Sequence, residues 1–359
     1  MRALVVLTQP PLPEGGAPGR TAIGLLRGLM GHGVDVHAIA ARRGFSVPGE
    51  VPGDLPVELV DVPPPGPFQA RLQRVTRPLG ELTGVFAERV RAAAADADLV
   101  HLEESETAWC DEGIDKPSLV HLHYLARLDR GFGAPWSKQF REVLDATRAE
   151  RAAVRRHRWV VASSPLVAAE LGRDVVVAPL SLDPSLYRPS PLDGPPTAGL
   201  IGTAAWPPTA AALRVLREEV WPLVRVPGAE LVVAGRGTER FGGLGEVESA
   251  REVFQRFSLL LFPLPRGSGM KVKVLEAIAS GVPVVTTPAG AEGIAPSDGV
   301  VVETEPHALA SAATELLQDE RACRERGAAA RKTFEEHHSP GPATEPLVEL
   351  YRRLTAARA

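Results

Sequence analysis

The stretch from residue 259 to residue 287 reads LLLFPLPRGSGMKVKVLEAIASGVPVVTT, and it decides the fold class. Its apolar run Leu259–Phe262 predicts a short buried strand, and a loop with glycines at 267 and 269 follows. Lys273–Ala279 then has helical periodicity, and Val282–Thr286 predicts the next strand. A strand, a glycine loop, a helix and a second strand in this order predict a parallel α/β unit.

The loop in this stretch suits an anionic ligand. Its glycines allow backbone N–H groups to turn toward a ligand, and the following helix points its positive end at the same loop. Arg266, Lys271 and Lys273 add positive charge, which suits a diphosphate. Glu276 lies further along the helix, where a carboxylate can accept hydrogen bonds from paired ribose hydroxyls. The residues alone leave a second interpretation open, a surface turn with solvated lysines and a helix glutamate.

The same alternation of strands and helices is predicted along the rest of the chain. Further strands are predicted at Leu4–Leu7, Val34–Ile39, Leu99–Leu102, Leu119–Leu122, Trp159–Ala162, Gly199–Ile201, Glu230–Ala234 and Gly299–Val302. Further helices are predicted at Thr21–Gly31, Glu142–Arg158, Thr209–Val220, Ala308–Arg331 and Pro346–Ala356. Strands that alternate with helices predict two doubly wound parallel sheets in tandem, an α/β architecture that places ligands in the crevice between its domains.

Proline-rich segments suggest where the domains divide. Pro184–Pro196 is the predicted linker, which gives an N-terminal domain over residues 1–185 and a C-terminal domain over residues 186–335. Residues 336–359 are predicted to form a helical tail that packs back toward the N-terminal domain.

Composition excludes several classes of protein. The 359 residues carry a net charge of -4, which argues against a duplex-DNA binder, and we expect no nucleic-acid partner. The two cysteines, Cys110 and Cys323, are too few for a cysteine-based zinc site or a disulfide framework. No apolar run approaches the ~18 residues of a membrane span, and the N-terminal run is too short for a signal peptide. We therefore expect a soluble, cytoplasmic protein without a transmembrane segment.

Several motifs resemble one known family. Residues 266–276, with GVPVV at 281–285 and GAEG at 290–293, resemble the donor site of family 4 glycosyltransferases of the GT-B fold. GTAAWPPT at 202–209 and ELVVAGRG at 230–237 resemble the first half of that family's nucleotide-binding domain. PEGGAPGR at 13–20 resembles its N-terminal glycine loop. The resemblance covers nearly the whole chain and is strongest over residues 199–294.

This resemblance implies an activity. The chain would be a retaining, metal-independent hexosyltransferase with two Rossmann-like domains that face a central cleft. Its co-substrate would be a UDP- or GDP-linked sugar, it would need no cofactor, and its acceptor would be a small hydroxylated natural product or saccharide.

The resemblance also implies roles for individual residues. Glu276 would bind the nucleotide ribose, the loop 267–271 would hold the donor sugar and the diphosphate, and the glycines at 15 and 16 would approach the phosphates. The full predicted donor set is Gly15, Gly16, Gly202, Thr203, Arg236, Arg266, Gly267, Ser268, Gly269, Met270, Lys271, Lys273 and Glu276. Lys271 is also predicted to act in catalysis, because a cation stabilises the charge of the departing diphosphate. No metal ligand is predicted.

Two departures from the family pattern change this assignment. Ser268 stands where many family members have a second glutamate that contacts the sugar, and residues 203–209 contain no basic residue where many members have an Arg–Lys pair. We therefore assign the phosphate charge to Arg266, Lys271 and Lys273. Arg236 could assist them, although a Gly-Arg-Gly turn is more typical of a solvated loop.

The acceptor side is predicted around the strand that ends PSLVHLHY at residues 117–124. His121 and His123 project to the same face because side chains alternate along a strand. The family has a histidine at the end of this strand, and His123 matches it by its spacing from Pro117. We predict that His123 is catalytic and positions hydroxyl groups, and that His121 packs within the sheet. Further acceptor contacts are predicted at Glu103, Phe132 and Trp136.

Two alternatives share the same donor site. The first is a GT-B-fold sugar-nucleotide epimerase or phosphorylase, which needs no large acceptor. The second is a catalytically inactive protein that binds nucleotide sugars, an interpretation that Ser268 in place of the glutamate makes conceivable.

Overall fold

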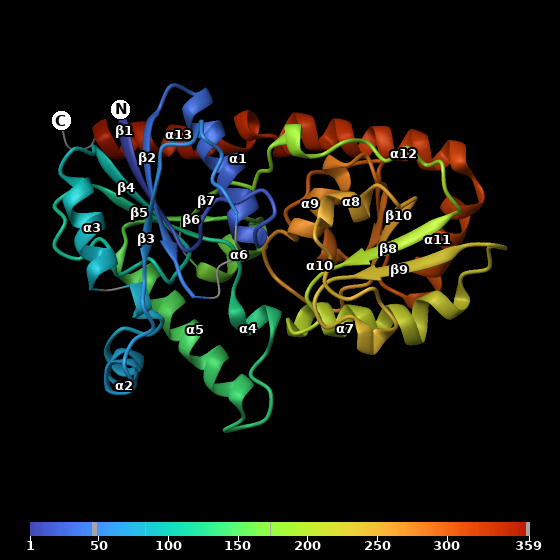
Figure 1. Cartoon of the computed structure of the whole chain (residues 1–359), viewed down its shortest axis with the longest axis horizontal. Helices are drawn as coiled ribbons and strands as arrows, with labels where there is room; N and C mark the ends of the chain where they lie inside the picture. The colour runs from blue at the N-terminus through green and yellow to red at the C-terminus, as the bar shows by residue number, and fades with distance from the viewer. Residues whose placement is uncertain (45–48, 83, 173, 357–359) are drawn as a thin grey trace. The chain divides into compact units, whose positions relative to one another are not determined.

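The computed structural model describes residues 1–44, 49–82, 84–172 and 174–356, and its chain divides into two compact units. Unit 1 comprises Met1–Ser181 and Pro340–Ala359, and unit 2 comprises Leu182–Ser339. Each unit contains one sheet, and every pair of neighbouring strands in both sheets is parallel (Figure 1). The predicted fold class of two doubly wound parallel-sheet domains is therefore confirmed.

The sheet of unit 1 has the strand order β3-β2-β1-β4-β5-β6-β7. Its strands are β1 (Arg2–Leu7), β2 (Asp35–Arg42), β3 (Val57–Asp61), β4 (Leu99–Glu103), β5 (Ser118–Leu122), β6 (Trp159–Ala162) and β7 (Val176–Val177). Its helices are α1 (Ala17–Gly31), α2 (Pro67–Thr76), η1 (Gly80–Leu82), α3 (Val85–Ala94), α4 (Ala126–Asp129), α5 (Lys138–Arg156), α6 (Pro165–Leu171) and α13 (Pro340–Ala356). The strand order reverses between β1 and β4, the point where open α/β sheets bind ligands.

The central strands of unit 1 are continuous apolar runs because helices bury both of their faces. Residues 3 to 6 of β1 are fully buried, and Val100 and Leu102 of β4 join Phe86 and Val90 of α3 in the same core cluster. Within β1, β4 and β5, polar side chains stand at the first or last residue, at Arg2, Ser118 and Glu103, apart from His101 and His121 in the interior of β4 and β5.

The last described helix, α13, belongs to unit 1 and packs against α1 (Figure 1). A Cβ at Gly28 of α1 would lie 2.3 Å from the backbone oxygen of Pro340 and 2.5 Å from Oγ1 of Thr344, so only glycine permits this approach. The prediction that this helix begins at Pro346 was wrong, since α13 begins at Pro340 and contains Pro346. Burial of Ala343 and Leu347 on either side of Pro346 stabilises the turn that the proline weakens.

The sheet of unit 2 has the order β12-β11-β10-β8-β9. Its strands are β8 (Thr197–Ile201), β9 (Glu230–Ala234), β10 (Leu259–Phe262), β11 (Val284–Thr286) and β12 (Val300–Val302). Its helices are η2 (Pro184–Leu186), α7 (Pro207–Val215), η3 (Leu216–Val220), η4 (Trp221–Leu223), η5 (Glu239–Phe241), α8 (Ala250–Phe254), α9 (Val272–Ala279), α10 (Pro288–Ala291), α11 (Pro306–Gln318), α12 (Glu320–Thr333) and η6 (Phe334–His338).

Two features of unit 2 differ from the prediction. The helix expected over Ala308–Arg331 is two helices, because Asp319 leaves the helical conformation and its Oδ1 caps α12 by accepting from the Ala322 amide at 3.0 Å. The segment 184–196 packs on unit 2, where Ser190 donates its backbone N–H to Ser280 at 3.0 Å, and the division falls after Ser181. Among the described residues, no helix combines the length and apolar composition that crossing a bilayer requires.

Candidate functional site

In unit 2, the candidate site is the loop over residues 263–271, which leaves the central strand β10 and enters α9. Gly269 has φ +63°, a left-handed conformation that glycine adopts without steric cost. Lys271 occupies the position before the first helical residue and provides no side-chain cap. The first N–H groups of a helix lack intrahelical partners and attract anions, so this end of α9 suits a phosphate group.

The cations predicted for this site differ in their placement. Lys271 donates to the backbone oxygens of Ser268 and, at 2.8 Å, of Gly269, so its ammonium group closes the loop on itself. The Nζ atom of Lys273 lies 3.4 Å from Oγ1 of Thr209 and 4.7 Å from the centre of the Phe262 ring. Arg266 is exposed on the loop. The loop therefore contains two cations, Arg266 and Lys271, and Lys273 adds a third from the first turn of α9. Of the three, Lys271 is tied to the backbone of the glycine turn.

Glu276 lies on the buried side of α9. Its side chain is 2% exposed, and its Oε1 accepts a hydrogen bond of 3.0 Å from the Tyr187 hydroxyl. Tyr187 follows η2 and is itself buried, so it orients the carboxylate. Ser268 and Met270 of the loop are also buried, at 1% and 6% exposed.

The ends of β8 and β9 form a close glycine contact in the same unit. A Cβ at Gly235, which has φ +120°, would lie 2.4 Å from the backbone oxygen of Gly202. Thr203 after Gly202 is exposed. Arg236 is exposed as well and pairs with Glu246, with 2.7 Å between Nη2 and Oε1. Its place in a surface ion pair matches the solvated interpretation of the Gly-Arg-Gly turn.

In unit 1, the predicted glycine loop follows β1 and begins α1. Gly15 donates its backbone N–H to Leu12 at 3.0 Å, and Gly16 is the N-cap residue of α1 with φ -63° and ψ 167°. The Arg20 side chain donates to the backbone oxygen of Gly15, which holds the turn against the helix. Gly15 and Gly16 thus stand at the amino end of a 15-residue helix.

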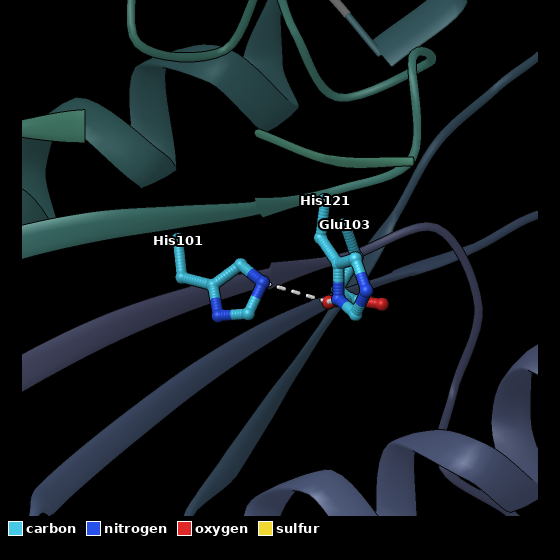
Figure 2. Close-up of side chains that lie close together, drawn as sticks. All are labelled: His101, Glu103 and His121. Atoms are coloured by element: carbon cyan, nitrogen blue, oxygen red, sulfur yellow. Dashed lines mark hydrogen bonds and ion pairs between the residues drawn. The ribbon is translucent and has the colours of Figure 1, made fainter. Parts of the chain in front are cut away.

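Four buried side chains from β4, β5 and the residue that follows β5 meet at one place. We call them the His–Glu cluster: His101, Glu103, His121 and His123. The register of the two strands pairs Glu103 with His121. Oε1 of Glu103 lies 2.7 Å from Nε2 of His101 and 3.1 Å from Nδ1 of His121 (Figure 2). Oε2 of Glu103 lies 2.6 Å from Nε2 of His123. One carboxylate therefore contacts three imidazoles.

Burial and charge shift the pKa values in this cluster in opposite directions. Burial opposes the charge on His123, but the carboxylates of Glu103 and Glu104 outweigh it and raise the pKa of His123 to about 10. Burial also opposes the charge on Glu103, but the imidazoles of His123, His121 and His101 lower the pKa of that carboxyl well below its usual value. For His121, burial dominates and lowers the pKa.

His101, Glu103 and His121 form a group whose atoms could offer ligands to a metal ion. The contacts of 2.7 Å and 3.1 Å to Oε1 of Glu103 are hydrogen-bond spacings. Ligands at about 2.0–2.1 Å from a tetrahedral zinc ion stand more than ~3 Å apart, so the residues as placed fit a proton-sharing network better than a zinc site.

The other acceptor-side residues are more open. Phe132 is 39% exposed and Trp136 is 84% exposed, and both rings approach Phe140 of α5, with centroid distances of 5.8 and 6.3 Å. Glu103, predicted to touch the acceptor, is 6% exposed and faces the imidazoles. A cavity of about 550 Å³ lies at the ends of β2 and β3, where Leu12, Leu59 and Val62 give it apolar walls.

Three residues of these sites were not predicted from the sequence. Tyr187 binds Glu276, Tyr351 of α13 binds His101, and Glu104 contacts His123. Glu104 was visible as a carboxylate at a strand end, but no local pattern links either tyrosine to a partner 89 or 250 positions away.

Comparison with known proteins agrees with this architecture. Residues 195–319 match the model of a family described as glycosyl transferases group 1. No curated protein sequence matches the chain.

Among solved structures, sucrose-phosphate synthase from Thermosynechococcus elongatus is similar with a TM-score of 0.73 and 16% identity, over 99% of this chain and 100% of that one. HepE of Anabaena, in complex with UDP and glucose, has a TM-score of 0.65 and 16% identity, over 98% and 100%. S. aureus TarM, in a complex that contains UDP, has a TM-score of 0.67 and 8% identity, over 98% and 99%. The resemblance stated from the sequence is thus confirmed: the chain has the GT-B glycosyltransferase fold, and its residues 195–319 match the group 1 glycosyl transferases.

Proposed function

We propose that the chain is a glycosyltransferase that moves a hexose from a nucleotide-diphosphate sugar to a small hydroxylated acceptor, with retention of anomeric configuration. The observation that carries the proposal is the 263–271 loop, where a left-handed glycine leads into the N-terminus of α9 and Glu276 lies buried in the same helix. A helix N-terminus with cations beside it stabilises a diphosphate in the ground state and in the transition state.

Within this site, the roles divide between the loop and the helix. The amides at the start of α9, with Arg266 and Lys273, would bind the diphosphate, and Lys271 would hold the glycine turn in the shape that presents those amides. Glu276, oriented by the Tyr187 hydroxyl, would accept hydrogen bonds from the ribose. Gly202 would approach the donor through its backbone, and Gly235 permits the arrangement, because a Cβ there would lie 2.4 Å from the backbone oxygen of Gly202.

We propose UDP as the nucleotide product. Two of the similar structures, HepE and TarM, are complexes that contain UDP. The proposal needs neither a cofactor nor a metal ion, because the helix end and the cations supply the positive potential that a departing diphosphate requires. It also assigns the chain to the cytoplasm, where nucleotide sugars are available.

The acceptor would bind to unit 1. The cavity of about 550 Å³ has apolar walls and the ion pair of Arg42 and Asp61 beside them, with 2.7 Å between Nε and Oδ1. Ligand pockets of this size combine apolar walls with a few polar groups. The exposed rings of Phe132 and Trp136 would add flat surfaces that suit a sugar or a planar natural product.

Calorimetric titration with UDP and GDP tests the donor site. We expect UDP to bind the wild type and Lys271→Met to weaken that binding at least about tenfold, because the loop would lose two hydrogen bonds to a charged group. Lys332→Met removes an exposed lysine of α12 and serves as the matched control with unchanged affinity. Absence of binding for both nucleotides would contradict the proposal.

Product analysis separates the alternatives. A transferase releases UDP in proportion to the glycosylated acceptor, whereas an epimerase converts the sugar nucleotide when no acceptor is present. Tight nucleotide binding without turnover over a broad panel of acceptors would instead favour the inactive binding protein.

A further inference from the structure

Helix α2 of unit 1 has an apolar face that the rest of the described chain does not cover. Phe68, Leu72 and Val75 follow one another at spacings of four and three residues, which places them on one side of a helix. They are 83%, 55% and 69% exposed. We call the surface made by these three residues the α2 apolar face.

The neighbouring helix α1 shows how such a face is normally treated. Its apolar residues Ile23, Leu26 and Leu29 also recur at helical spacing, and all three are fully buried because α1 packs on β2 and α13. The apolar residues of α2 stay in water instead. An exposed apolar patch on a folded protein indicates a surface that binds a partner.

The chain on both sides of α2 holds the helix in place. Before it, the proline-rich segment 63–67 forms a stiff arm. After it, Nε1 of Trp109 donates to the backbone oxygen of Pro78 at 3.2 Å. Nη2 of Arg148 in α5 donates to the backbone oxygen of Val75 at 3.1 Å. Figure 1 shows α2 at the edge of unit 1, away from the strands of the sheet, so its apolar face projects from a fixed position.

The charge of this region is positive, although the whole chain has a net charge of -4. Residues 62–80 contain the three arginines Arg71, Arg74 and Arg77 and no acidic residue. Helix α5, which contacts α2 through Arg148, contains six basic and three acidic residues. Arg77 forms an ion pair with Glu112, with 2.6 Å between Nη2 and Oε2. The excess of positive charge favours a partner with a negative surface.

We propose that the α2 apolar face binds the surface of a lipid bilayer that contains anionic phospholipids. A helix with Phe and Leu on one face, in a basic segment of low overall hydrophobicity, lies in the plane of the interface. Its apolar side chains enter the boundary between headgroups and acyl chains, and its basic groups face the lipid phosphates. A bilayer supplies apolar depth and negative charge at one flat surface, so a single projecting helix needs no matching groove on its partner.

The length of α2 determines the kind of contact. Its ten residues extend over about 15 Å, half of the ~30 Å thickness of the hydrocarbon core, so the helix lies on the membrane and does not cross it. One short helix with three apolar side chains gives weak, reversible attachment that depends on anionic lipid. This attachment does not depend on the proposed sugar transfer, because the α2 apolar face contains none of the donor-site residues.

Co-sedimentation with lipid vesicles tests the proposal on the full chain. We expect the wild type to bind vesicles of phosphatidylcholine with about one third phosphatidylglycerol at least about tenfold more strongly than vesicles of phosphatidylcholine alone. The binding should be lost when the salt is raised from about 0.1 M to about 1 M, where the screening length falls from about 10 Å to about 3 Å. Absence of binding to the anionic vesicles, or equal binding to both kinds of vesicle, would overturn the inference.

Matched variants test whether α2 provides the contact. Phe68→Gln with Leu72→Gln should weaken binding to the anionic vesicles at least about tenfold, because the helix loses most of its apolar face. Leu244→Gln is the control, since Leu244 in unit 2 is as exposed as Leu72, at 55%, and should leave binding unchanged. Circular dichroism verifies that the variants are folded. Undiminished binding in the double variant would overturn the assignment to α2.

A second pair of variants tests the charge. Arg71→Gln with Arg74→Gln should weaken binding to the anionic vesicles about tenfold and leave the weak binding to phosphatidylcholine unchanged. Arg321→Gln with Arg324→Gln removes the same charge from exposed positions on α12 and should have no comparable effect. An equal loss in both double variants would show that only the net charge of the protein matters, and this would contradict a specific role of α2.

Two further measurements separate the outcomes. UDP affinity should be unchanged in Phe68→Gln with Leu72→Gln, so failure of the wild type to bind UDP would count against the proposed function and not against membrane attachment. Sedimentation velocity without lipid examines self-association. A wild-type dimer that Phe68→Gln with Leu72→Gln converts to a monomer, together with no vesicle binding, would overturn the inference and assign the α2 apolar face to a second copy of the chain.

Discussion

The two candidate sites of this protein are built in opposite ways. In unit 2, the site is a continuous stretch from the end of β10 to Glu276 in α9, and its main chemistry comes from backbone groups and one glycine turn. In unit 1, the His–Glu cluster joins side chains of β4, of β5 and of the loop after β5 to Tyr351 of α13, and its chemistry depends on buried charges. One chain thus contains both a local backbone site and a long-range side-chain network.

Because of this difference, the two sites tolerate different amino-acid substitutions. Backbone amides persist when most side chains around them change, so the loop of unit 2 is sensitive mainly at Gly269 and at Lys271, whose ammonium group closes the turn. A buried charge has no such protection, because the loss of its partner leaves it unpaired in a medium that water does not reach.

The largest expected effect is on the stability of unit 1. Glu103→Ala should lower the free energy of unfolding by about 3–5 kcal/mol, because it leaves the buried His123 imidazolium without its nearest carboxylate. Urea unfolding followed by circular dichroism measures it. Glu246→Ala, which breaks an exposed ion pair in unit 2, is the control and should have no comparable effect. Equal losses in the two variants would remove the contrast between the sites.

A second prediction concerns Glu150, another buried charge of unit 1. Burial raises the pKa of its carboxyl from 4.5 to about 7, although the Ala126 amide donates to it at 2.8 Å. The folded state therefore holds a proton that the unfolded state releases, and this contribution to stability is full below pH 4.5 and lost as the pH rises to 7.

Glu150→Gln keeps an oxygen for the Ala126 amide and removes the titration. It should raise the free energy of unfolding at pH 8 by up to about 3 kcal/mol and have little effect at pH 4.5. Denaturant unfolding at both pH values measures the difference. A gain of the same size at both values would show that Glu150 does not titrate in this range.

The third prediction examines the backbone site. Gly269→Val places a β-branched residue at φ +63° and should weaken UDP binding about tenfold or more, since the loop must change shape to relieve the strain. Gly269→Asn is the matched control, because asparagine tolerates the left-handed conformation, and it should retain most of the affinity. Calorimetry on both variants provides the measurement. If the two variants bind UDP with equal affinity, the left-handed turn at Gly269 does not shape the site.

The smallest effect is expected at Arg236. Because its guanidinium is exposed and paired with Glu246, Arg236→Ala should change UDP affinity less than about twofold. A loss of tenfold would show instead that Arg236 leaves its ion pair to bind the diphosphate, as the donor set predicted from the sequence allows.

Much of the fold could be predicted because its central strands are apolar runs. β6, β9 and β10 begin and end at the predicted residues, since apolar side chains fill them apart from the exposed Glu230 at the start of β9. β3 was missed because its residues Val57–Asp61 are partly exposed and mix charged with apolar side chains. The break between α11 and α12 was missed because the sequence around Asp319 looks like the polar face of one continuous amphipathic helix. Only the structure shows that the Asp319 side chain caps α12.

The candidate sites also differ in how far they could be predicted from the sequence. The glycine loop, Lys271 and Glu276 belong to one short segment, so the spacing of their residues was enough to propose an anion site. Tyr187, which binds Glu276, and Tyr351, which binds His101, could not be predicted. A hydrogen bond between residues far apart in the chain produces no periodic pattern in the sequence. Glu103 was recognised as a site residue, but its three imidazole contacts depend on the register of β4 and β5.

Helix α13 follows unit 2 in the chain but packs on unit 1, and this affects how unit 1 folds during synthesis. Because Tyr351 of α13 binds His101, which lies 250 positions earlier, residues 1–181 cannot complete unit 1 before α13 has been synthesised. They must keep the face of α1 uncovered while all of unit 2 is synthesised. The face of α1 that α13 covers is therefore a place where newly made chain can associate wrongly until α13 arrives.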